Sequence, residues 1–225
     1  MTDFRDHLIG SLNQDEAQKH ARLKVLRSLL EQTPLPAPQA LVPQIKGSSE
    51  IFFGYLVEAT AKTFEPRTAF QNQSIQFFLI DQTYDLSIQT IMGLQPSPHL
   101  VRRLHQCDEE SIVESRLRGF ASYTVPLNSQ SDLARVQYLL EFGLDHGLES
   151  ILDLCEPGLC EIAQRLDAPG IIISSQNLLQ EDLNTLADTR ALILDLQEKE
   201  HTERFAALRH KYGVVLRSHY ATIEN

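Results

Sequence analysis

The sequence predicts an α/β protein in which strands and helices alternate along the chain. Three observations carry this prediction. Short apolar runs rich in β-branched and aromatic residues recur at a regular interval from residue 50 onward, and the segments between them mostly show helical spacing. In addition, residues 151–173 and 192–216 both run strand, acidic residue, helix, glycine, strand. Such alternation implies parallel strands joined by right-handed crossovers.

The first part of the chain predicts a helical extension followed by a linker. Residues 3–32 carry apolar positions at helical spacing among charged residues, which predicts one or two amphipathic helices. The segment TPLPAPQALVP then contains four prolines in eleven residues and ends the helical pattern. We therefore assign residues 1–45 to an N-terminal helical extension with a Pro-rich linker, and residues 46–225 to one barrel domain.

Eight candidate strands follow the linker, and their number selects the architecture. They are residues 51–59, 74–81, 98–103, 120–127, 150–154, 170–174, 191–196 and 213–218. Eight βα units favour a closed (β/α)8 TIM barrel over an open doubly wound sheet, which has about five or six strands. The 225-residue chain is shorter than the typical barrel of about 250 residues, so we expect trimmed helices and loops. The open sheet stays an alternative because the second and third runs are weak strand signals.

Composition excludes several classes of partner. The net charge of −10 argues against nucleic acid or an anionic membrane as the main partner, although a local basic pocket for a small anion is compatible with it. The polar, acidic N-terminus does not resemble a signal peptide, and no run reaches membrane-spanning length. We expect a cytoplasmic protein with its three cysteines reduced.

In a barrel the ligand site lies at the carboxyl ends of the strands, so its residues can be located before its chemistry is known. These ends carry Glu58 and Thr60, Asp81, Arg103 and His105, Asn128, Asp153 and Cys155, Ser174 to Asn177, Asp195 and Gln197, and Arg217 to His219. The expected mouth of the barrel is therefore polar and of mixed charge.

The stretch ILDLCEPGLC, residues 151–160, gathers two acids and two thiols after an apolar run. Asp153 and Glu156 have the character of acid–base groups. A strand-end acid explains Asp153 equally simply, and for Glu156 we favour a helix-start acid stabilised by the helix dipole. Cys155 and Cys160 are four residues apart, unlike the Cys-x2-Cys pairs of zinc sites, and Cys160 fits an apolar helix face. We predict no metal site.

Residues 147–178, GLESILDLCEPGLCEIAQRLDAPGIIISSQNL, resemble the fifth and sixth strands of indole-3-glycerol phosphate synthase, a barrel family of tryptophan biosynthesis. DEESIVESRLRG at 108–119 resembles the helix after the family's third strand, and FLIDQTYDLSI at 78–88 resembles its second strand. The resemblance spans nearly the whole chain and is strongest from 98 to 188.

The resemblance implies candidate catalytic residues. Glu58 falls on a first-strand glutamate of the family, Arg103 on the third-strand lysine that acts as general acid, and Asp153 on a fifth-strand glutamate. The candidate substrate-binding positions are Thr60, Asp81, Ser174, Gln176 and Arg217. Thr60 and Arg103 replace both family lysines, and an arginine stays protonated at accessible pH, so it is a poor proton donor.

The resemblance therefore predicts a lyase-type barrel in which the family's ring closure and decarboxylation are lost or weakened. It implies no cofactor and an anionic or phosphorylated small molecule as ligand. One alternative is an active lyase or isomerase on a related phosphorylated substrate. A second is a non-enzymatic binding or scaffold protein that contacts a protein partner through its N-terminal helices.

Overall fold

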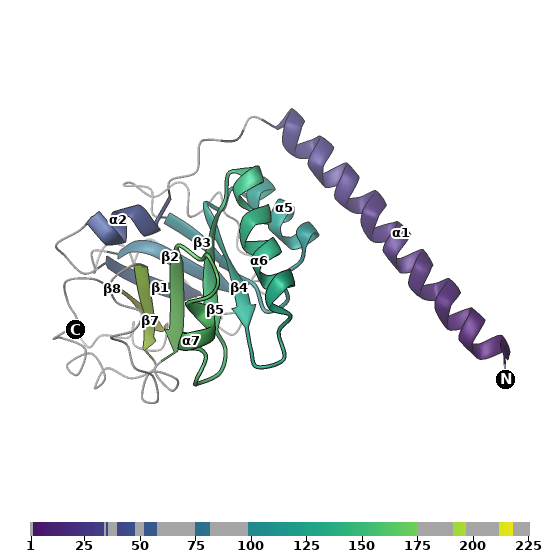
Figure 1. The fold of residues 1–225 in the computed structure, drawn as a ribbon. Helices are drawn as coiled ribbons and strands as arrows, with labels where there is room; N and C mark the ends of the chain where they lie inside the picture. Colours follow the sequence, from purple (N-terminus) through teal and green to yellow (C-terminus); the bar gives the residue numbers. More distant parts are fainter. Residues whose placement is uncertain are drawn as a thin grey trace.

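A computed structural model gives the fold of this chain and describes residues 2–33, 35, 40–47, 52–57, 75–81, 99–174, 191–196 and 212–217 (Figure 1). The strands are β1 (Phe52–Val57), β2 (Ile75–Asp81), β3 (His99–Arg103), β4 (Ser122–Leu127), β5 (Glu149–Leu154), β6 (Gly170–Ser174), β7 (Ala191–Leu196) and β8 (Tyr212–Arg217). The helices are α1 (Thr2–Gln32), α2 (Val42–Gly47), α5 (Glu109–Leu117), α6 (Leu133–Phe142), the 3-10 turn η1 (Leu144–His146) and α7 (Cys160–Ala163).

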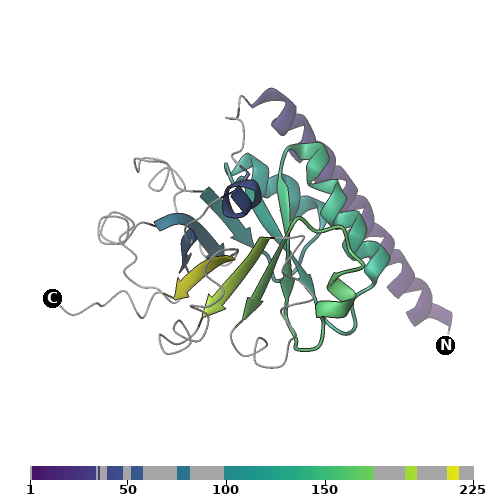
Figure 2. The ribbon, with the colours of Figure 1, turned by 60° about the vertical axis from the view of Figure 1, so that its left-hand side comes forward.

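The strands pair in parallel in chain order, and β8 pairs in turn with β1. The predicted α/β class and parallel pairing are confirmed, and these ladders agree with a closed sheet rather than the open alternative (Figure 2). In the described residues, α5, α6 and α7 follow β3, β4 and β5 on the outside of the sheet. A helix after every strand, which the complete (β/α)8 pattern requires, stays a prediction.

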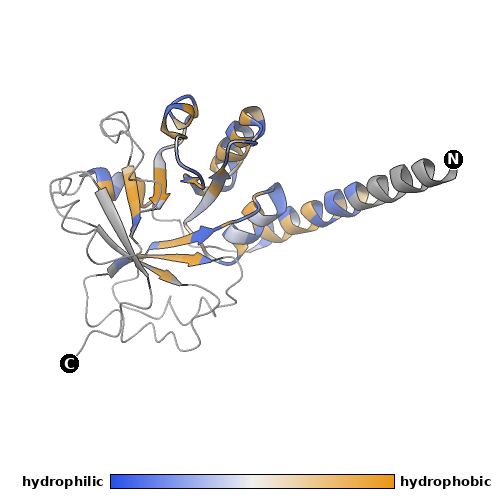
Figure 3. Cartoon of the chain, turned by 90° about the horizontal axis from the view of Figure 1, so that it is seen from below, coloured by the Kyte–Doolittle hydropathy of each residue, from blue (hydrophilic) through white to orange (hydrophobic). Residues whose placement is uncertain are grey.

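Side chains alternate between the two faces of the strands and form two apolar layers. The inner layer fills the space enclosed by the sheet, and it contains Leu56, Phe77, Leu79, Val101, Ile151, Ile172, Ala191 and Ile193. Gly54 belongs to this face because a Cβ there would lie only 2.1 Å from the Phe77 ring. The outer layer packs the strands against α5, α6 and α7, and it includes Tyr123, Val125, Leu152, Leu154, Ile171 and Ile173. Figure 3 shows this apolar colouring along the strands and on the helices that cover them.

Helix α2 lies at the amino end of the sheet, inside the segment that the sequence predicts as a Pro-rich linker. Its side chains Val42 and Ile45, together with Leu41, are buried in the inner apolar layer. The backbone N–H groups of Leu41 and Val42 donate to the carboxylate of Glu149, at 2.9 Å and 3.1 Å. The short helix therefore closes one end of the sheet. It crosses the boundary predicted between residues 45 and 46, which stays a prediction.

Helix α1 is one continuous helix, where the sequence allows one or two. Its residues Leu23, Leu26 and Leu30 pack against the outer apolar layer. Arg22 lies 3.5 Å from the carboxylate of Glu110 on α5. Among the described residues, no helix is both long and apolar enough to cross a membrane. The cytoplasmic location stays a prediction.

Candidate active site at the carboxyl ends of the strands

Arg103, the last residue of β3, forms the centre of an ion-pair cluster at the carboxyl ends of the strands. Its Nε–H donates to Asp153 Oδ2 at 2.8 Å, and its Nη2 donates to Asp153 Oδ1 at 3.2 Å. Its Nη1 donates to Asp195 Oδ2 at 2.9 Å. Arg103 is the last residue of β3, and Asp153 and Asp195 are the last but one of β5 and β7. All three lie on the inner face, so the curled sheet brings together groups that are distant in sequence. A guanidinium held at both sides in this way has a fixed orientation.

The cluster is buried and carries one negative charge more than positive when both acids are ionised. Asp153 is 3% exposed and Asp195 is fully buried. Burial raises the pKa of the Asp153 carboxyl, and the charge of Arg103 offsets only part of this effect. Burial alone would lower the pKa of Arg103, but the charges of Asp153 and Asp195 outweigh it and raise that pKa. The cluster therefore holds a permanent cation beside a carboxylate that takes up a proton more readily than usual.

The Arg103 guanidinium retains hydrogen-bonding capacity. A guanidinium has five N–H groups, and three of them donate to the two aspartates. Within the described part of the chain, the remaining N–H on Nη1 and the one on Nη2 make no hydrogen bond. Arg103 also keeps 15% of its side chain exposed. The guanidinium therefore has donor groups left for an oxygen atom of a ligand.

His105 and Asp81 form a second pair beside Arg103. The ring Nε2 of His105 lies 2.6 Å from Asp81 Oδ2, and since a carboxylate only accepts, Nε2–H is the donor when the ring is neutral. Asp81 is opposite Arg103 in the ladder between β2 and β3. Asp81 is nearly buried, whereas the His105 side chain is 53% exposed. A carboxylate thus orients an imidazole that reaches solvent, the arrangement of a proton-transferring histidine.

The thiols near this site are poor nucleophiles. Burial, with the charge of Asp153 adding to it, raises the pKa of Cys155 to about 11. Burial likewise raises the pKa of Cys107 to about 12. Both thiols therefore stay protonated near neutral pH, and thiolate is the form that attacks carbon or binds metal. In the described part of the chain, no three His, Cys, Asp or Glu side chains come together as a metal site.

The structure brings Arg103, Asp153 and Asp81 of the predicted site together. Ser174 ends β6 beside Asp195 in the ladder. Three other candidates, Glu58, Thr60 and Gln176, lie outside the described residues, as does the side chain of Arg217 at the end of β8. Their predicted roles stay predictions.

Two residues at this end of the sheet, Asp195 and His105, received no role in the sequence analysis, although the strand-end rule places both at the mouth. Asp195 contacts Arg103, and His105 contacts Asp81. The signal in the sequence that could have given Asp195 and His105 a role was their position at or just after the end of a strand. Glu156, in contrast, is half-buried and accepts from the backbone N–H of Ser129 at 2.9 Å, so it links two loops.

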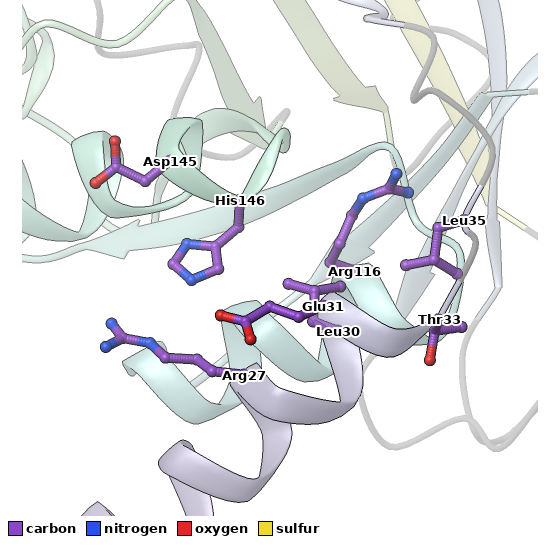
Figure 4. A pocket seen from close by; sticks show the side chains of 8 residues that line it. All are labelled: Arg27, Leu30, Glu31, Thr33, Leu35, Arg116, Asp145 and His146. Atoms are coloured by element: carbon purple, nitrogen blue, oxygen red, sulfur yellow. The ribbon is translucent and has the colours of Figure 1, made fainter.

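A separate cavity of about 420 Å³ lies at the opposite end of the sheet. Figure 4 shows its lining side chains, which are Arg27, Leu30, Glu31, Thr33, Leu35, Arg116, Asp145 and His146. They come from the end of α1 and the residues after it, the last turn of α5, and η1, which precedes β5. Because helices run back toward the amino ends of the strands, this cavity is remote from Arg103.

Comparison with known proteins identifies the fold and no family. No protein-family model matches the chain, and no curated protein matches it. Among solved structures, 184 chains match, so the likeness is to a widely used fold. One is the crystal structure of an HpcH/Hpal aldolase/citrate lyase family protein from Burkholderia cenocepacia J2315. It has a TM-score of 0.58 at 8% sequence identity, over 80% of this chain and 92% of that chain.

These comparisons overturn the resemblance to indole-3-glycerol phosphate synthase. The solved structure described above belongs to a different barrel family, and nothing in the comparisons supports the tryptophan-pathway family. The quoted segments share features that any βα unit requires, namely an apolar strand, a strand-end acid and an amphipathic helix. At 8% identity the likeness to the aldolase/citrate lyase family protein shows the shared barrel-like α/β fold alone.

Proposed function

We propose that this protein is a lyase that acts on a small oxo- or hydroxy-acid, with Arg103 holding a developing oxyanion and the His105–Asp81 pair moving a proton. The observation that carries the proposal is the fixed, partly exposed Arg103 guanidinium beside an exposed, carboxylate-bound imidazole. The likeness in fold to an aldolase/citrate lyase family protein supports the same reaction class. We also propose that the fold completes the (β/α)8 pattern.

The role of Arg103 follows from its fixed position. Donors that already point at the place where negative charge develops stabilise a transition state without reorganising, and one such donor contributes on the order of 100-fold to 1000-fold in rate. Asp153 and Asp195 hold the guanidinium at both sides, so its two remaining N–H groups are held in place as well. They suit the oxygen of a carbonyl that becomes an enolate.

The role of His105 follows from its partner and its exposure. In the neutral ring Nε2–H donates to Asp81, so Nδ1 is the basic nitrogen. This nitrogen takes the proton of a substrate hydroxyl, the adjacent carbon–carbon bond breaks, and its electron pair forms an enolate whose oxygen binds Arg103. The imidazolium then returns the proton to the enolate carbon. Each step balances without a further reactant.

The charge of the cluster narrows the substrate class. Arg103 does not attract anions strongly, because Asp153 and Asp195 together outweigh its charge. A neutral carbonyl oxygen that gains charge only during the reaction suits this environment better than a phosphate group that is charged from the start. We therefore place an oxo group, rather than a phosphate, at Arg103.

Proton exchange tests this proposal without knowledge of the full substrate. A lyase that forms enolates exchanges the hydrogens next to the carbonyl, so the protein should replace them by deuterium in a panel of 2-oxo acids in D₂O, followed by ¹H NMR. We expect Arg103→Lys and His105→Asn to lower the exchange rate about 100-fold or more. The matched control is His146→Asn, which changes a histidine of the remote cavity and should leave the rate unchanged. Absence of exchange across the panel, or exchange that His105→Asn does not alter, would contradict the proposal.

A further inference from the structure

The cavity of about 420 Å³ that is remote from Arg103 is formed jointly by α1 and the barrel. Leu30 and Glu31 come from the end of α1, Arg116 comes from α5, and His146 comes from η1 (Figure 4). Small-molecule sites in proteins have volumes of about 300–1,000 Å³, so this cavity has a suitable size. A molecule bound in it would contact both α1 and the barrel.

The C-terminal end of α1 presents negative charge to the cavity. A helix C-terminus is the negative end of the helix dipole and favours a nearby cation, but the last turn of α1 contains no basic residue. It contains instead the exposed acid Glu31. Within the part of the chain that the structure describes, the Glu31 carboxylate makes no ion pair or hydrogen bond. A positively charged group of a ligand would therefore be stabilised beside Glu31.

Two arginines bring positive charge to the same cavity. Arg27 is four residues before Glu31, a spacing at which helical side chains are neighbours, but its guanidinium lies over the Phe142 ring, 5.2 Å from the ring centre. Among the described side chains it has no ion-pair partner. Arg116 is only 8% exposed, and burial lowers the pKa of its guanidinium. A carboxylate of a ligand near these arginines would stabilise their charge.

The charges that line the cavity balance one another. The described lining contains two positive and two negative side chains, and a histidine that is uncharged in its neutral form, namely Arg27 and Arg116, Glu31 and Asp145, and His146. A plain anion or a plain cation would match only one sign of this lining. A small molecule that carries one charge of each sign matches both.

We propose that this cavity binds a free α-amino acid with an apolar side chain. Its ammonium group faces Glu31 and the C-terminal end of α1, and its carboxylate faces the two arginines. Leu30 and Leu35, which also line the cavity, provide apolar surface for its side chain. The site shares no residue with the Arg103 cluster, and the proposal does not depend on the proposed lyase function.

The first test compares L-leucine with two analogues that each lack one charge, by isothermal titration calorimetry on the full chain. Isocaproate lacks the ammonium group, and leucinamide lacks the carboxylate. Each should bind at least about tenfold more weakly than L-leucine, because each loses one charged hydrogen-bonding group. Isocaproate that binds as tightly as L-leucine would reveal a plain anion site and overturn the proposal. So would the absence of binding by L-leucine, L-valine and L-phenylalanine at up to about 10 mM.

The second test assigns the ammonium group to Glu31. Glu31→Gln changes an exposed side chain to a neutral one of the same size, so we expect the fold to persist. It should lower the affinity for L-leucine at least about tenfold and leave that for isocaproate unchanged. The matched control is Glu16→Gln, an exposed change on the same helix 15 residues earlier, about 22 Å along its axis. If Glu31→Gln binds L-leucine as the wild type does, the proposal is wrong.

The third test locates the bound molecule, because the proposed active site also accepts acids. L-Leucine in the cavity should slow backbone amide exchange in the C-terminal half of α1, since it links this helix to the barrel. It should also bind His105→Asn with wild-type affinity, so this proposal and the proposed lyase function can fail separately. Protection confined to the ends of β3 and β5 would place L-leucine at Arg103 and contradict the proposal.

Discussion

Strand β5 carries a carboxylate at or near each of its ends, and different groups donate hydrogen bonds to the two. Asp153 is buried, and Glu149 is half-buried. At the amino end, Glu149 accepts from the backbone N–H groups of Leu41 and Val42 and from the hydroxyl of Ser122. At the carboxyl end, Asp153 accepts from the Arg103 guanidinium. Burial raises the pKa of both acids.

The comparison shows how the same kind of group serves structure at one end and chemistry at the other. Backbone N–H groups cannot move freely or change charge, so their bonds to Glu149 fix α2 against the sheet. Helix α2 then closes the amino end of the sheet. At the other end Arg103 keeps part of its side chain exposed and lies next to the solvent-reaching His105. A buried charge bound by a partner that also faces solvent can act on a ligand. A carboxylate such as Glu149, whose partners are only backbone N–H groups and a neighbouring hydroxyl, cannot act on a ligand in this way.

The largest effect should follow from removing the cation at the carboxyl end. Arg103→Met leaves Asp153 and Asp195 buried without their partner, and breaking a buried ion pair in this way costs about 3–5 kcal/mol of unfolding free energy. Urea unfolding followed by circular dichroism measures the loss. Changing all three residues in Arg103→Met, Asp153→Asn, Asp195→Asn should recover much of it, since no unpaired charge remains. An Arg103→Met variant as stable as the wild type would show that the cluster does not hold the sheet.

A smaller effect should follow from neutralising the carboxylate at the amino end. Glu149→Gln keeps one acceptor oxygen for the two backbone N–H groups, but it replaces the other oxygen, which also faces the N–H of Val42, by an amide NH₂ that cannot accept. We expect a loss of about 1–3 kcal/mol in the same unfolding experiment. Exchange of 2-oxo acid hydrogens should be unaffected, because Glu149 lies at the far end of β5 from Arg103. If folded Glu149→Gln loses most of the exchange rate, then Glu149 does not serve structure alone, and the proposed difference between the two ends of β5 is wrong.

The pH dependence of stability should separate Glu149 further. Because its pKa is raised in the folded state above the ordinary value of 4.5, the folded chain binds more protons than the unfolded chain just above that pH. The contribution of Glu149 to stability is therefore full below 4.5 and is lost as pH rises through its folded pKa. Urea midpoints of the wild type should fall relative to those of Glu149→Gln over this window. Parallel midpoints for the two proteins would show that Glu149 does not titrate abnormally.

The strand-end rule predicts that Arg103, Asp153 and Asp195 lie at the same end of the sheet, but it does not predict how they pair. Arg103, Asp153 and Asp195 each stand on the inner face at the end of a strand, and this parity can be read from the sequence. We could not predict that the Arg103 guanidinium binds both Asp153 and Asp195, because these partners are 50 and 92 residues from Arg103 in the chain. Their meeting depends on the curl of the whole sheet.

Helix α2 and the family resemblance show two further limits. The prolines of residues 33–43 predict a linker, but Pro43 stands in the first turn of α2, where a missing N–H costs nothing. The apolar spacing of Leu41, Val42 and Ile45 was the overlooked signal. The resemblance to a synthase family misled for another reason, because the patterns that it rested on are required by the fold and not by the reaction.

The smallest effect on stability should come from the residue on which the proposed chemistry depends most. His105 is half exposed, so His105→Asn should change the unfolding free energy by only about 0.5 kcal/mol. The same change removes the basic nitrogen, and the exchange rate should fall about 100-fold or more. Asp81→Asn should act in the same direction but more weakly, because it disturbs only the orientation of the ring. If His105→Asn instead destabilises the fold while leaving exchange intact, the pair is a structural contact, and the contrast between the two ends of the barrel fails.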